Sequence, residues 1–356
     1  MVPVGMPGLV LAVDGGNSKT DVLLVDATGR LLAAGRGGSI SHQAVGIEEG
    51  MARLSGLVSE VADLARRVYE GGHERRVGHG RGVDGERLAA VGVYCLAGAD
   101  FPRDVRLLRD HIGRLGLART ELVLNDCYAA LRAGARQGYG VALICGQGIN
   151  GACVAPDGRV ARFAAVGSLS GDWGGATSLG EAALGAAIRA RDGRGSRTSL
   201  ERAVPAHFRL ARPEALMLAM YEERIPERRL SELSPVVFAA AEAGDGVARA
   251  IVEHLADELA LMAVALLRRL GMLRRWVEVV LAGGVFRTRD DGFYQRLASR
   301  VHAAAPRAQL VRLDAPPVLG AALLGLDQLA QGPLPRPDDE AAMQLRADVE
   351  RWSAAR

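Results

Sequence analysis

The sequence predicts an α/β protein built from two copies of one strand-rich unit. Apolar runs of strand length alternate with segments of helical periodicity between residues 88 and 136, which is typical of a mainly parallel sheet with right-handed crossovers. A strand–loop–strand–turn–strand pattern over 9–34 then returns over 141–165. Because 356 residues exceed the usual length of a single core, we expect about two domains.

The composition is that of an ordinary globular protein. The net charge is only +3 and the basic residues are spread along the chain, which argues against a nucleic-acid partner. No stretch reads as a membrane span, and residues 1–13 lack the basic region of a signal peptide, so we expect a cytoplasmic protein. The four cysteines form no C-x-x-C pair and the histidines show no ligand spacing, which indicates reduced core thiols and no structural metal.

The first repeat opens on two apolar runs, 9–13 and 22–25, which predict a hairpin with a polar tip. Gly15 and Gly16 are expected to turn with positive φ and to expose backbone N–H groups, which would make an anion cradle suited to phosphate. The side chains that add donors to this loop are Asn17, Ser18, Lys19 and Thr20. Lys19 is the only lysine in the chain, and Asp14 is placed to hold Mg²⁺ through water. An ordinary glycine-rich hairpin is the alternative interpretation.

Polar residues follow the next two predicted strands. The strand 88–96 ends in Ala-Gly-Ala-Asp100, and the strand 120–124 ends in Asn125-Asp126, each followed by a helical segment. Asp100 fits a sugar-binding or hinge role, and equally the N-cap of the helix predicted over 103–115. Residues 71–86, rich in Gly, Arg and His, are predicted to form a surface loop.

The second repeat places Gly146-Gln-Gly-Ile-Asn150 between two strands, like the first loop. Downstream, Gly283 and Gly284 follow a buried strand, where they suit either the close approach of a nucleoside or a tight turn into a helix. These patterns divide the chain into a domain at 1–126, a domain at 127–332 that carries the nucleotide site, and a C-terminal tail at 333–356, interpreted as an appendage.

Six motifs in this order make the sequence similar to the BadF/BadG/BcrA/BcrD-type ATPase family, within it to the N-acetylglucosamine kinase branch. The resemblance spans 9–329 and rests on Asp14-Gly-Gly-Asn-Ser-Lys-Thr20, Leu96-Ala-Gly-Ala-Asp100, Asn125-Asp126, Gly146-Gln-Gly-Ile-Asn150, Asp172-Trp-Gly174 and Ala282-Gly-Gly-Val285. It implies the duplicated ribonuclease H-like fold of actin and hexokinase, with a cleft between the two domains.

The resemblance also implies roles for individual residues. Asp126 falls at the catalytic carboxylate, where a strand-end carboxylate accepts a proton from a sugar hydroxyl. The residues implied to bind ATP are Gly15, Gly16, Asn17, Ser18, Lys19, Thr20, Gly146, Gln147, Gly148, Gly283 and Gly284. Those implied to bind sugar are Ser41, His42, Asp100, Ile149, Asn150, Asp172, Trp173 and Gly174.

Three departures from the family pattern concern these sites. Gln147 replaces a usual Thr in the second phosphate loop, and Ser41 replaces a usual Asn. After Trp173 the sequence continues Gly-Gly-Ala-Thr instead of Gly-Asp-Glu-Gly, so the usual sugar-binding Asp is missing and Asp172 is expected to replace it.

The predicted function is an ATP- and Mg²⁺-dependent kinase that phosphorylates the 6-hydroxyl of an amino sugar such as N-acetylglucosamine, acting as a homodimer. The alternative within the family is an ATPase that activates a 2-hydroxyacyl-CoA dehydratase or benzoyl-CoA reductase. That class holds an iron–sulfur cluster at a dimer interface, and its Cys-Ala-Ala-Gly stretch is absent from this sequence. A silent sugar sensor is a third interpretation, which would need an output module.

Overall fold

The structure is a computed structural model that describes residues 8–70, 87–331 and 339–355. The predicted loop at 71–86 lies outside the described residues. The chain forms two compact units, one of residues 1–138 with 313–356 and one of residues 139–312. The chain returns to the first unit at residue 313, and not at the predicted boundary of 332, because the helix that follows residue 313 packs on the sheet of the first unit.

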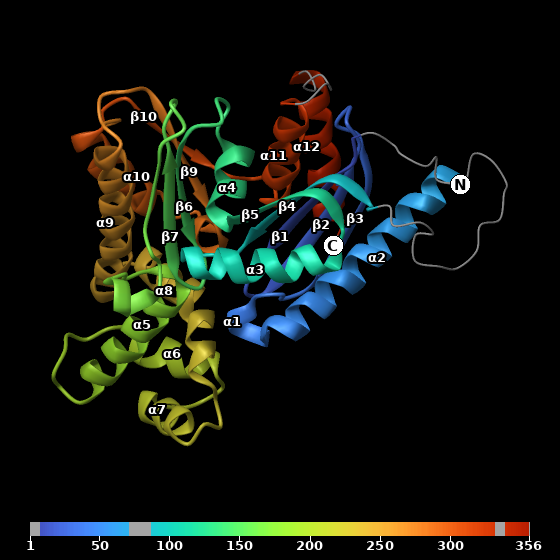
Figure 1. The fold of residues 1–356 in the computed structure, drawn as a ribbon. Coiled ribbons are helices and arrows are strands. Elements are labelled where there is room, and N and C mark those ends of the chain that lie inside the picture. The colour runs from blue at the N-terminus through green and yellow to red at the C-terminus, as the bar shows by residue number, and fades with distance from the viewer. Residues whose placement is uncertain (1–7, 71–86, 332–338, 356) are drawn as a thin grey trace. The chain divides into compact units, whose positions relative to one another are not determined.

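The first unit is built on a five-stranded mixed sheet in the order β3-β2-β1-β4-β5 (Figure 1). Strands β1, β2 and β3 are antiparallel neighbours, whereas β4 and β5 run parallel to β1. The strands are β1 (Val10–Gly15), β2 (Lys19–Val25), β3 (Leu31–Gly38), β4 (Ala89–Leu96) and β5 (Ala118–Asn125).

Helices cover both faces of this sheet. Because side chains alternate along a strand, Leu11 and Val13 of β1 face one core, while Val10 and Ala12 face the other. The first core is closed by α2 (Ile47–Glu70) and α3 (Pro102–Leu115), and the second by α4 (Asp126–Gly134), α11 (Val318–Leu329) and α12 (Asp339–Ala354). The short α1 (His42–Val45) precedes α2.

The second unit repeats this plan, with a five-stranded sheet in the order β10-β9-β6-β7-β8. The strands that come first in the chain, β6, β7 and β8, are again antiparallel neighbours, and β9 and β10 run parallel to β6. The strands are β6 (Gly140–Cys145), β7 (Ile149–Val154), β8 (Val160–Arg162), β9 (Val277–Ala282) and β10 (Ala308–Arg312). The predicted α/β class and the predicted duplication are therefore confirmed.

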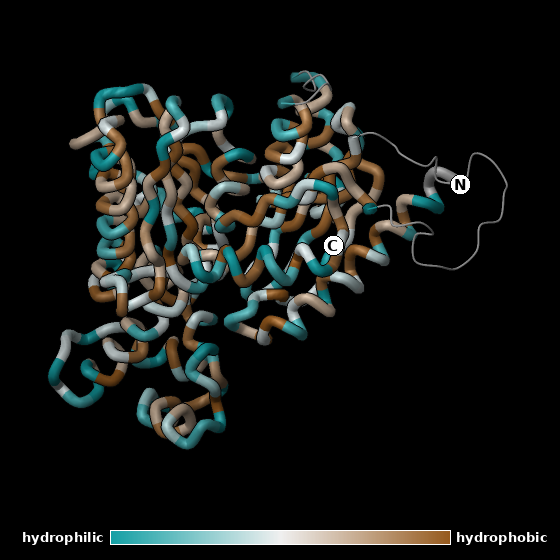
Figure 2. Tube along the Cα trace, in the orientation of Figure 1, coloured by the Kyte–Doolittle hydropathy of each residue, from teal (hydrophilic) through white to brown (hydrophobic). Residues whose placement is uncertain are grey.

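The helices of the second unit pack around one large core. They are α5 (Gly175–Arg191), α6 (Leu200–His207), α7 (Pro213–Tyr221), α8 (Ser234–Glu242), α9 (Gly246–Arg269) and α10 (Asp291–Ala304), with short 3₁₀ turns at Gly167–Ser170, Glu227–Leu233 and Gly284–Arg287. Figure 2 shows hydrophobic residues concentrated along the strands and the inward faces of the helices of each unit.

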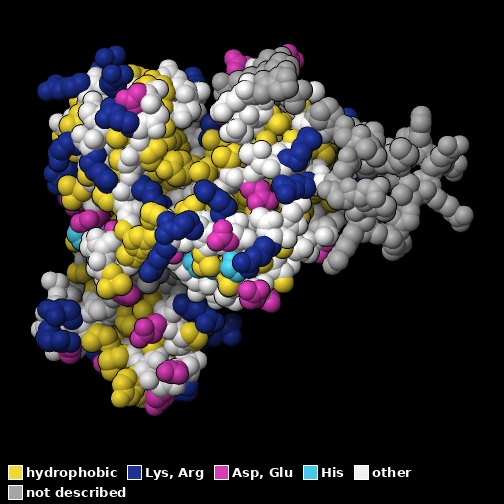
Figure 3. All heavy atoms as spheres, viewed as in Figure 1, with side chains coloured by type: hydrophobic (Ala, Val, Ile, Leu, Met, Phe, Trp, Pro, Cys, Tyr) yellow, Lys and Arg dark blue, Asp and Glu magenta, His cyan; other side chains and the backbone are white. Residues whose placement is uncertain are grey.

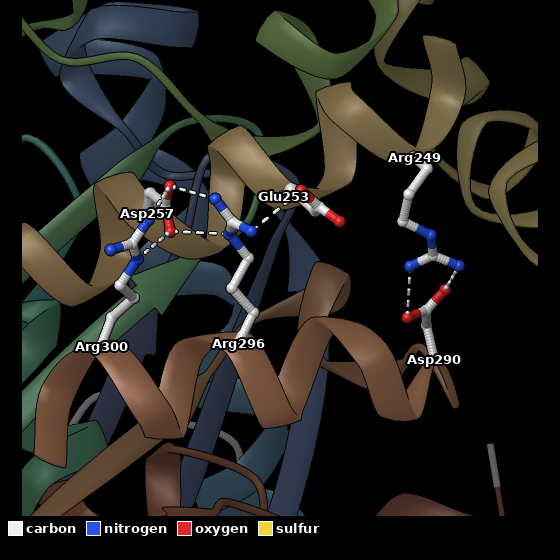
Figure 4. Close-up of polar contacts among 6 residues, drawn as sticks. All are labelled: Arg249, Glu253, Asp257, Asp290, Arg296 and Arg300. Atoms are coloured by element: carbon white, nitrogen blue, oxygen red, sulfur yellow. Dashed lines mark hydrogen bonds and ion pairs between the residues drawn. The ribbon is translucent and has the colours of Figure 1, made fainter. Parts of the chain in front are cut away.

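Ion pairs join α9 to α10 on the outside of this core (Figure 4). Arg296 lies between Glu253 and Asp257, at 2.9 and 2.7 Å, and Arg300 shares the Asp257 carboxylate. At the start of α10, Asp290 accepts a hydrogen bond from the backbone of Phe293 while Arg249 holds its carboxylate. These contacts fix two long helices through charge as well as apolar burial.

The surface shows no obvious single-sign field in the view drawn. Figure 3 shows basic and acidic side chains interspersed over the visible face. Among the described residues, no helix is both long and apolar enough to cross a membrane.

Candidate active site

Three strands of the first unit end together, and this edge gathers most of its predicted site residues. Gly15 at the end of β1 lies in register with Leu96 of β4, which in turn lies opposite Asn125 of β5. The backbone of Ala97 donates to Gly15 O over 2.8 Å. Parallel strand ends of this kind commonly form ligand sites in α/β proteins.

The predicted hairpin is present and tight. The backbone of Gly16 donates to Lys19 O over 2.9 Å, which leaves Asn17 and Ser18 as an exposed two-residue tip. The expectation of positive φ at Gly15 and Gly16 was wrong, because neither backbone lies in the left-handed region. A Cβ atom at Gly15 would instead lie 2.6 Å from Leu96 Cδ2, so close packing is what requires glycine there.

The polar side chains of the loop divide into two groups. Thr20 is fully buried and its hydroxyl donates to Gly38 O over 2.8 Å, so it faces the sheet. Lys19 remains nearly half exposed, and its Nζ atom lies 2.6 Å from Asp21 Oδ2. Asp21 is itself fully buried and also pairs with Arg36, a contact that was not predicted from the sequence.

The segment after β3 is tied to the hairpin. Ser39 Oγ donates to Gly16 O over 3.0 Å and accepts from the backbone of Ser41. Next to it, His42 reaches the turn after β4, since a Cβ atom at Gly98 would lie 3.0 Å from His42 Cε1. His42 therefore lies near the turn that precedes Asp100, while sugar binding by Ser41 and His42 stays a prediction.

Asn125 joins the two predicted carboxylates of this edge. Its Nδ2 atom donates to Asp100 Oδ1 over 3.0 Å, and its Oδ1 atom caps α4 by accepting from the backbone of Cys127. Asp126 follows as the first residue of that helix. The interpretation of Asp100 as an N-cap was wrong, because α3 begins at Pro102 after Phe101 and Asp100 bonds to Asn125 instead.

Burial and like charge shift two of these carboxyl groups. Burial raises the pKa of Asp126 to about 6, and the Asp100 charge adds to this shift. Burial, with repulsion from Asp126, raises the pKa of Asp14 to about 7. Perturbed acids clustered at a strand edge are typical of catalytic sites.

Several buried polar atoms at this edge have no hydrogen-bond partner. Among the described residues they include Ser41 Oγ, His42 Nδ1 and Asp126 Oδ1. Leaving a buried polar atom unpaired costs about 1–3 kcal/mol, so such atoms need a polar partner, either water or a ligand. This group of atoms is what the proposed function must explain.

The second glycine-rich loop has the same build in the second unit. The backbone of Gly146 donates to Gly148 O over 2.9 Å, and Gln147 and Gly148 are exposed. The start of α5 clamps this loop, since the backbones of Ala176 and Thr177 donate to its carbonyl groups. The Thr177 hydroxyl also donates to Gln147 Oε1 over 3.3 Å.

Two further glycines are required by this packing. Gly175 has φ of 79°, and a Cβ atom there would lie 2.4 Å from Gln147 O. Gly283, with φ of 108°, passes equally close to Cys145 O at the end of β6. Gly283 and Gly284 are both exposed beside the second loop. The strand-end position predicted for them is therefore correct, while their contact with nucleotide stays a prediction.

The residues of the second unit that were predicted to bind sugar lie around the start of α5. Ile149 is buried in the core, and Asn150 accepts from the backbone of Gly151. Trp173 is partly buried, with its ring centroid 4.1 Å from that of His254 on α9. Asp172 accepts from the Ser170 hydroxyl. His254, an exposed residue inside a helical pattern, carried no signal in the sequence.

Among the described residues, no group of three or more His, Cys, Asp or Glu side chains could hold a metal ion by itself. Mg²⁺ in phosphoryl-transfer sites usually relies on one or two carboxylates with water and substrate phosphates, so Asp14 fits that role. All four cysteines are buried, as predicted for core thiols.

Comparison with known proteins shows which family has this sequence pattern. Residues 11–325 match the BadF/BadG/BcrA/BcrD ATPase family. An N-acetylmuramic acid/N-acetylglucosamine kinase of Clostridium acetobutylicum is 26% identical, over 88% of this chain and 97% of that protein. An N-acetyl-D-glucosamine kinase of Dictyostelium discoideum is also 26% identical, over 90% and 98%.

Solved structures show the same fold. A provisionally named N-acetylglucosamine kinase from Chromobacterium violaceum superposes with a TM-score of 0.64 at 23% identity, over 89% of this chain and 99% of that one. A ROK hexokinase from Thermus thermophilus gives 0.51 at 22%, over 91% and 100%. The predicted family is confirmed: this chain belongs to the BadF/BadG/BcrA/BcrD ATPase family.

Proposed function

We propose that this protein is an ATP-dependent kinase that transfers the γ-phosphoryl group to the 6-hydroxyl of an amino sugar such as N-acetylglucosamine. The observation that carries the proposal is Asp126, a carboxylate at the start of α4 with one buried oxygen that has no partner. A sugar hydroxyl would supply that partner, and Ser41 and His42 offer further unpaired atoms to other hydroxyl or acetamido groups.

In this reaction the protein forms no covalent bond to the substrates, and its chemical contribution is to accept a proton. The sugar oxygen forms a bond to the γ-phosphorus, the bond to the bridging oxygen of ADP breaks, and the hydroxyl proton passes to Asp126. A carboxylate with a pKa of about 6 is ionised at neutral pH, yet holds a proton more readily than an ordinary aspartate. Asp126 therefore suits the role of general base.

We assign the nucleotide phosphates to the two glycine-rich loops and the adenosine to Gly283 and Gly284. In the first loop, exposed Asn17 and Ser18 and half-exposed Lys19 provide donors and charge. Mg²⁺ held by Asp14 through water would neutralise charge on the phosphates, and it would favour the ionised form of Asp14 against the burial and the like charges that raise the pKa of this carboxyl. Thr20 is fully buried and its hydroxyl donates to Gly38 O, so we assign it to holding the loop that binds the phosphates.

We assign sugar binding to Ser41, His42 and Asp100 in the first unit. In the second unit we assign Asn150, Asp172, Trp173 and Gly174, with Ile149 as packing beneath them. The indole of Trp173 would offer an apolar face to the ring or acetyl methyl, and Asp172 would accept from a hydroxyl. The homodimer and the cytoplasmic location stay predictions.

A coupled ADP-release assay across amino sugars, hexoses and muramic acid derivatives tests the proposal. We expect release that depends on an N-acetylated amino sugar and on Mg²⁺, and that stops when the metal is chelated. Phosphorus–proton NMR of the product should place the phosphate on the 6-oxygen. ADP release that is independent of every sugar would contradict the proposal.

A further inference from the structure

The C-terminal helix is part of the first unit and lies beyond the segment matched by the family. The match ends at residue 325, whereas α12 covers Asp339–Ala354. Leu345 and Val349 of this helix are fully buried in the core that also contains Val10 and Leu23. The predicted appendage is therefore wrong: α12 packs against α11 and β3 and covers one face of the sheet (Figure 1).

The last turn of α12 contacts a charged residue on β3. The guanidinium of Arg36 lies 5.2 Å from the centroid of the Trp352 ring, within the range of a cation–π interaction. Arg36 Nη2 also donates to Ser353 Oγ over 3.4 Å. The aromatic face and the hydroxyl together restrict where this guanidinium can lie.

Arg36 in turn holds the carboxylate that pairs with the phosphate loop. Its Nε and Nη2 atoms lie 2.5 and 3.0 Å from the two oxygens of Asp21, which is opposite Arg36 in the register of β2 and β3. Lys19 Nζ lies 2.6 Å from Asp21 Oδ2. Trp352 is thus linked to the tip of the first hairpin through three successive side chains.

Arg36 and Lys19 compete for one carboxylate. Both cations contact Asp21, which is fully buried, and the carboxyl group of Asp14 interacts with both of them as well. Arg36 binds both oxygens of Asp21, so the half-exposed Lys19 shares Asp21 Oδ2 with Arg36 and is held less strongly than in a pair of its own. Without Arg36, the pair between Lys19 and Asp21 would be stronger, and the ammonium would be less available to another anion.

We propose that α12 is a positioning element for the first phosphate loop: Trp352 and Ser353 hold Arg36 on Asp21, and Arg36 thereby leaves the charge of Lys19 available to a phosphate. This inference rests on the proposed function for the identity of the anion. Asp21, Arg36 and Trp352 are positioning residues, because they act through Lys19 and not on the substrate.

Lys19 is the only lysine, so its amine can be followed directly. The experiment measures the rate of Lys19 acetylation by peptide mass spectrometry in the full chain without nucleotide, relative to the α-amino group. In Arg36→Gln the rate should fall by at least about threefold, since an amine held by a carboxylate reacts slowly. Trp352→Leu should change it in the same direction by a smaller factor.

Two variants serve as controls. Trp352→Phe keeps an aromatic face over Arg36 and should restore the wild-type rate. Met343→Ala removes an exposed apolar side chain from the first half of the same helix and should leave the rate unchanged. Unchanged or faster acetylation in both Arg36→Gln and folded Trp352→Leu would overturn the proposal.

A second readout separates this inference from the proposed function. If both hold, Trp352→Leu raises the KM for ATP several-fold and leaves the KM for the sugar and kcat close to wild type. If acetylation slows and the protein has no kinase activity, the link from α12 to Lys19 stands and the proposed function fails. A fall in kcat with unchanged acetylation would indicate a general structural defect instead.

Discussion

Asn125 donates its side-chain amide to Asp100 over 3.0 Å while its carbonyl oxygen caps the helix that begins with Asp126. One residue therefore sets both the position of the neighbouring carboxylate and the start of the helix that carries the candidate base. Because Asn125 is only 3% exposed, neither contact is easily replaced by water.

The first prediction concerns this residue. Asn125→Ala should lower the free energy of unfolding by about 1–2 kcal/mol through loss of the cap, and should lower kcat because the first turn of α4 is no longer fixed. Asn125→Ser is the matched control, since serine can cap the helix but cannot reach Asp100 with an amide. Denaturation and turnover measured together would separate the two contacts, and wild-type values in Asn125→Ala would refute both roles.

The second prediction is a pH dependence. Since burial and Asp100 raise the pKa of Asp126 to about 6, kcat/KM should rise as the pH increases through about 6 and the base loses its proton. Asp100→Asn removes a like charge and should move this rise in kcat/KM, the acidic limb of the pH profile, to lower pH. A limb near the ordinary aspartate value of 3.8 would assign the proton transfer to another group.

The same shift makes a prediction about stability. The folded pKa of Asp126, about 6, exceeds the ordinary aspartate value of 3.8, so the stability that this carboxyl contributes is complete below pH 3.8 and is lost as the pH rises through 6. Asp126→Asn should therefore be more stable than wild type at pH 8, by up to about 3 kcal/mol, and nearly equal to it at pH 4. Thermal melts at the two pH values would test this; a less stable variant at pH 8 would contradict it.

The fourth prediction concerns the second loop. Gly175→Ala would place a Cβ atom 2.4 Å from Gln147 O at a φ of 79°, so the loop must move. We expect ATP affinity to fall by about tenfold or more, for a strain of about 1–3 kcal/mol. Gly185→Ala, in the same helix with open space around it, should leave ATP affinity unchanged. Equal calorimetric affinities for the two variants would remove this loop from the nucleotide site.

The sequence was informative where a local pattern determines the structure. Apolar runs located the strands, so the polar residues that follow 88–96 and 120–124 were correctly predicted to lie at strand ends. The structure adds that Gly15, Leu96 and Asn125 lie in register at one edge. The repeated strand–loop–strand pattern predicted the second sheet correctly. Glycine in the first loop was also noticed, but for the wrong reason, because a sequence does not show that Leu96 packs against Gly15.

Contacts between distant residues could not be predicted in this way. Asp100 and Asn125 are 25 positions apart, and Arg36 and Ser353 are 317 positions apart. The tail at 333–356 was interpreted as an appendage, whereas Leu345 and Val349 are buried in the core. Only the packing of β3 against α12 brings Trp352 to Arg36.

The central claim is that Asp126 accepts the proton of the sugar hydroxyl. The most direct test measures phosphoryl transfer by Asp126→Asn beside calorimetric binding of an ATP analogue. The account predicts a loss of turnover of ~10²–10⁴ with nucleotide affinity unchanged, because asparagine keeps the shape of the site and removes only the base. Turnover within about tenfold of wild type would contradict it and assign the base elsewhere.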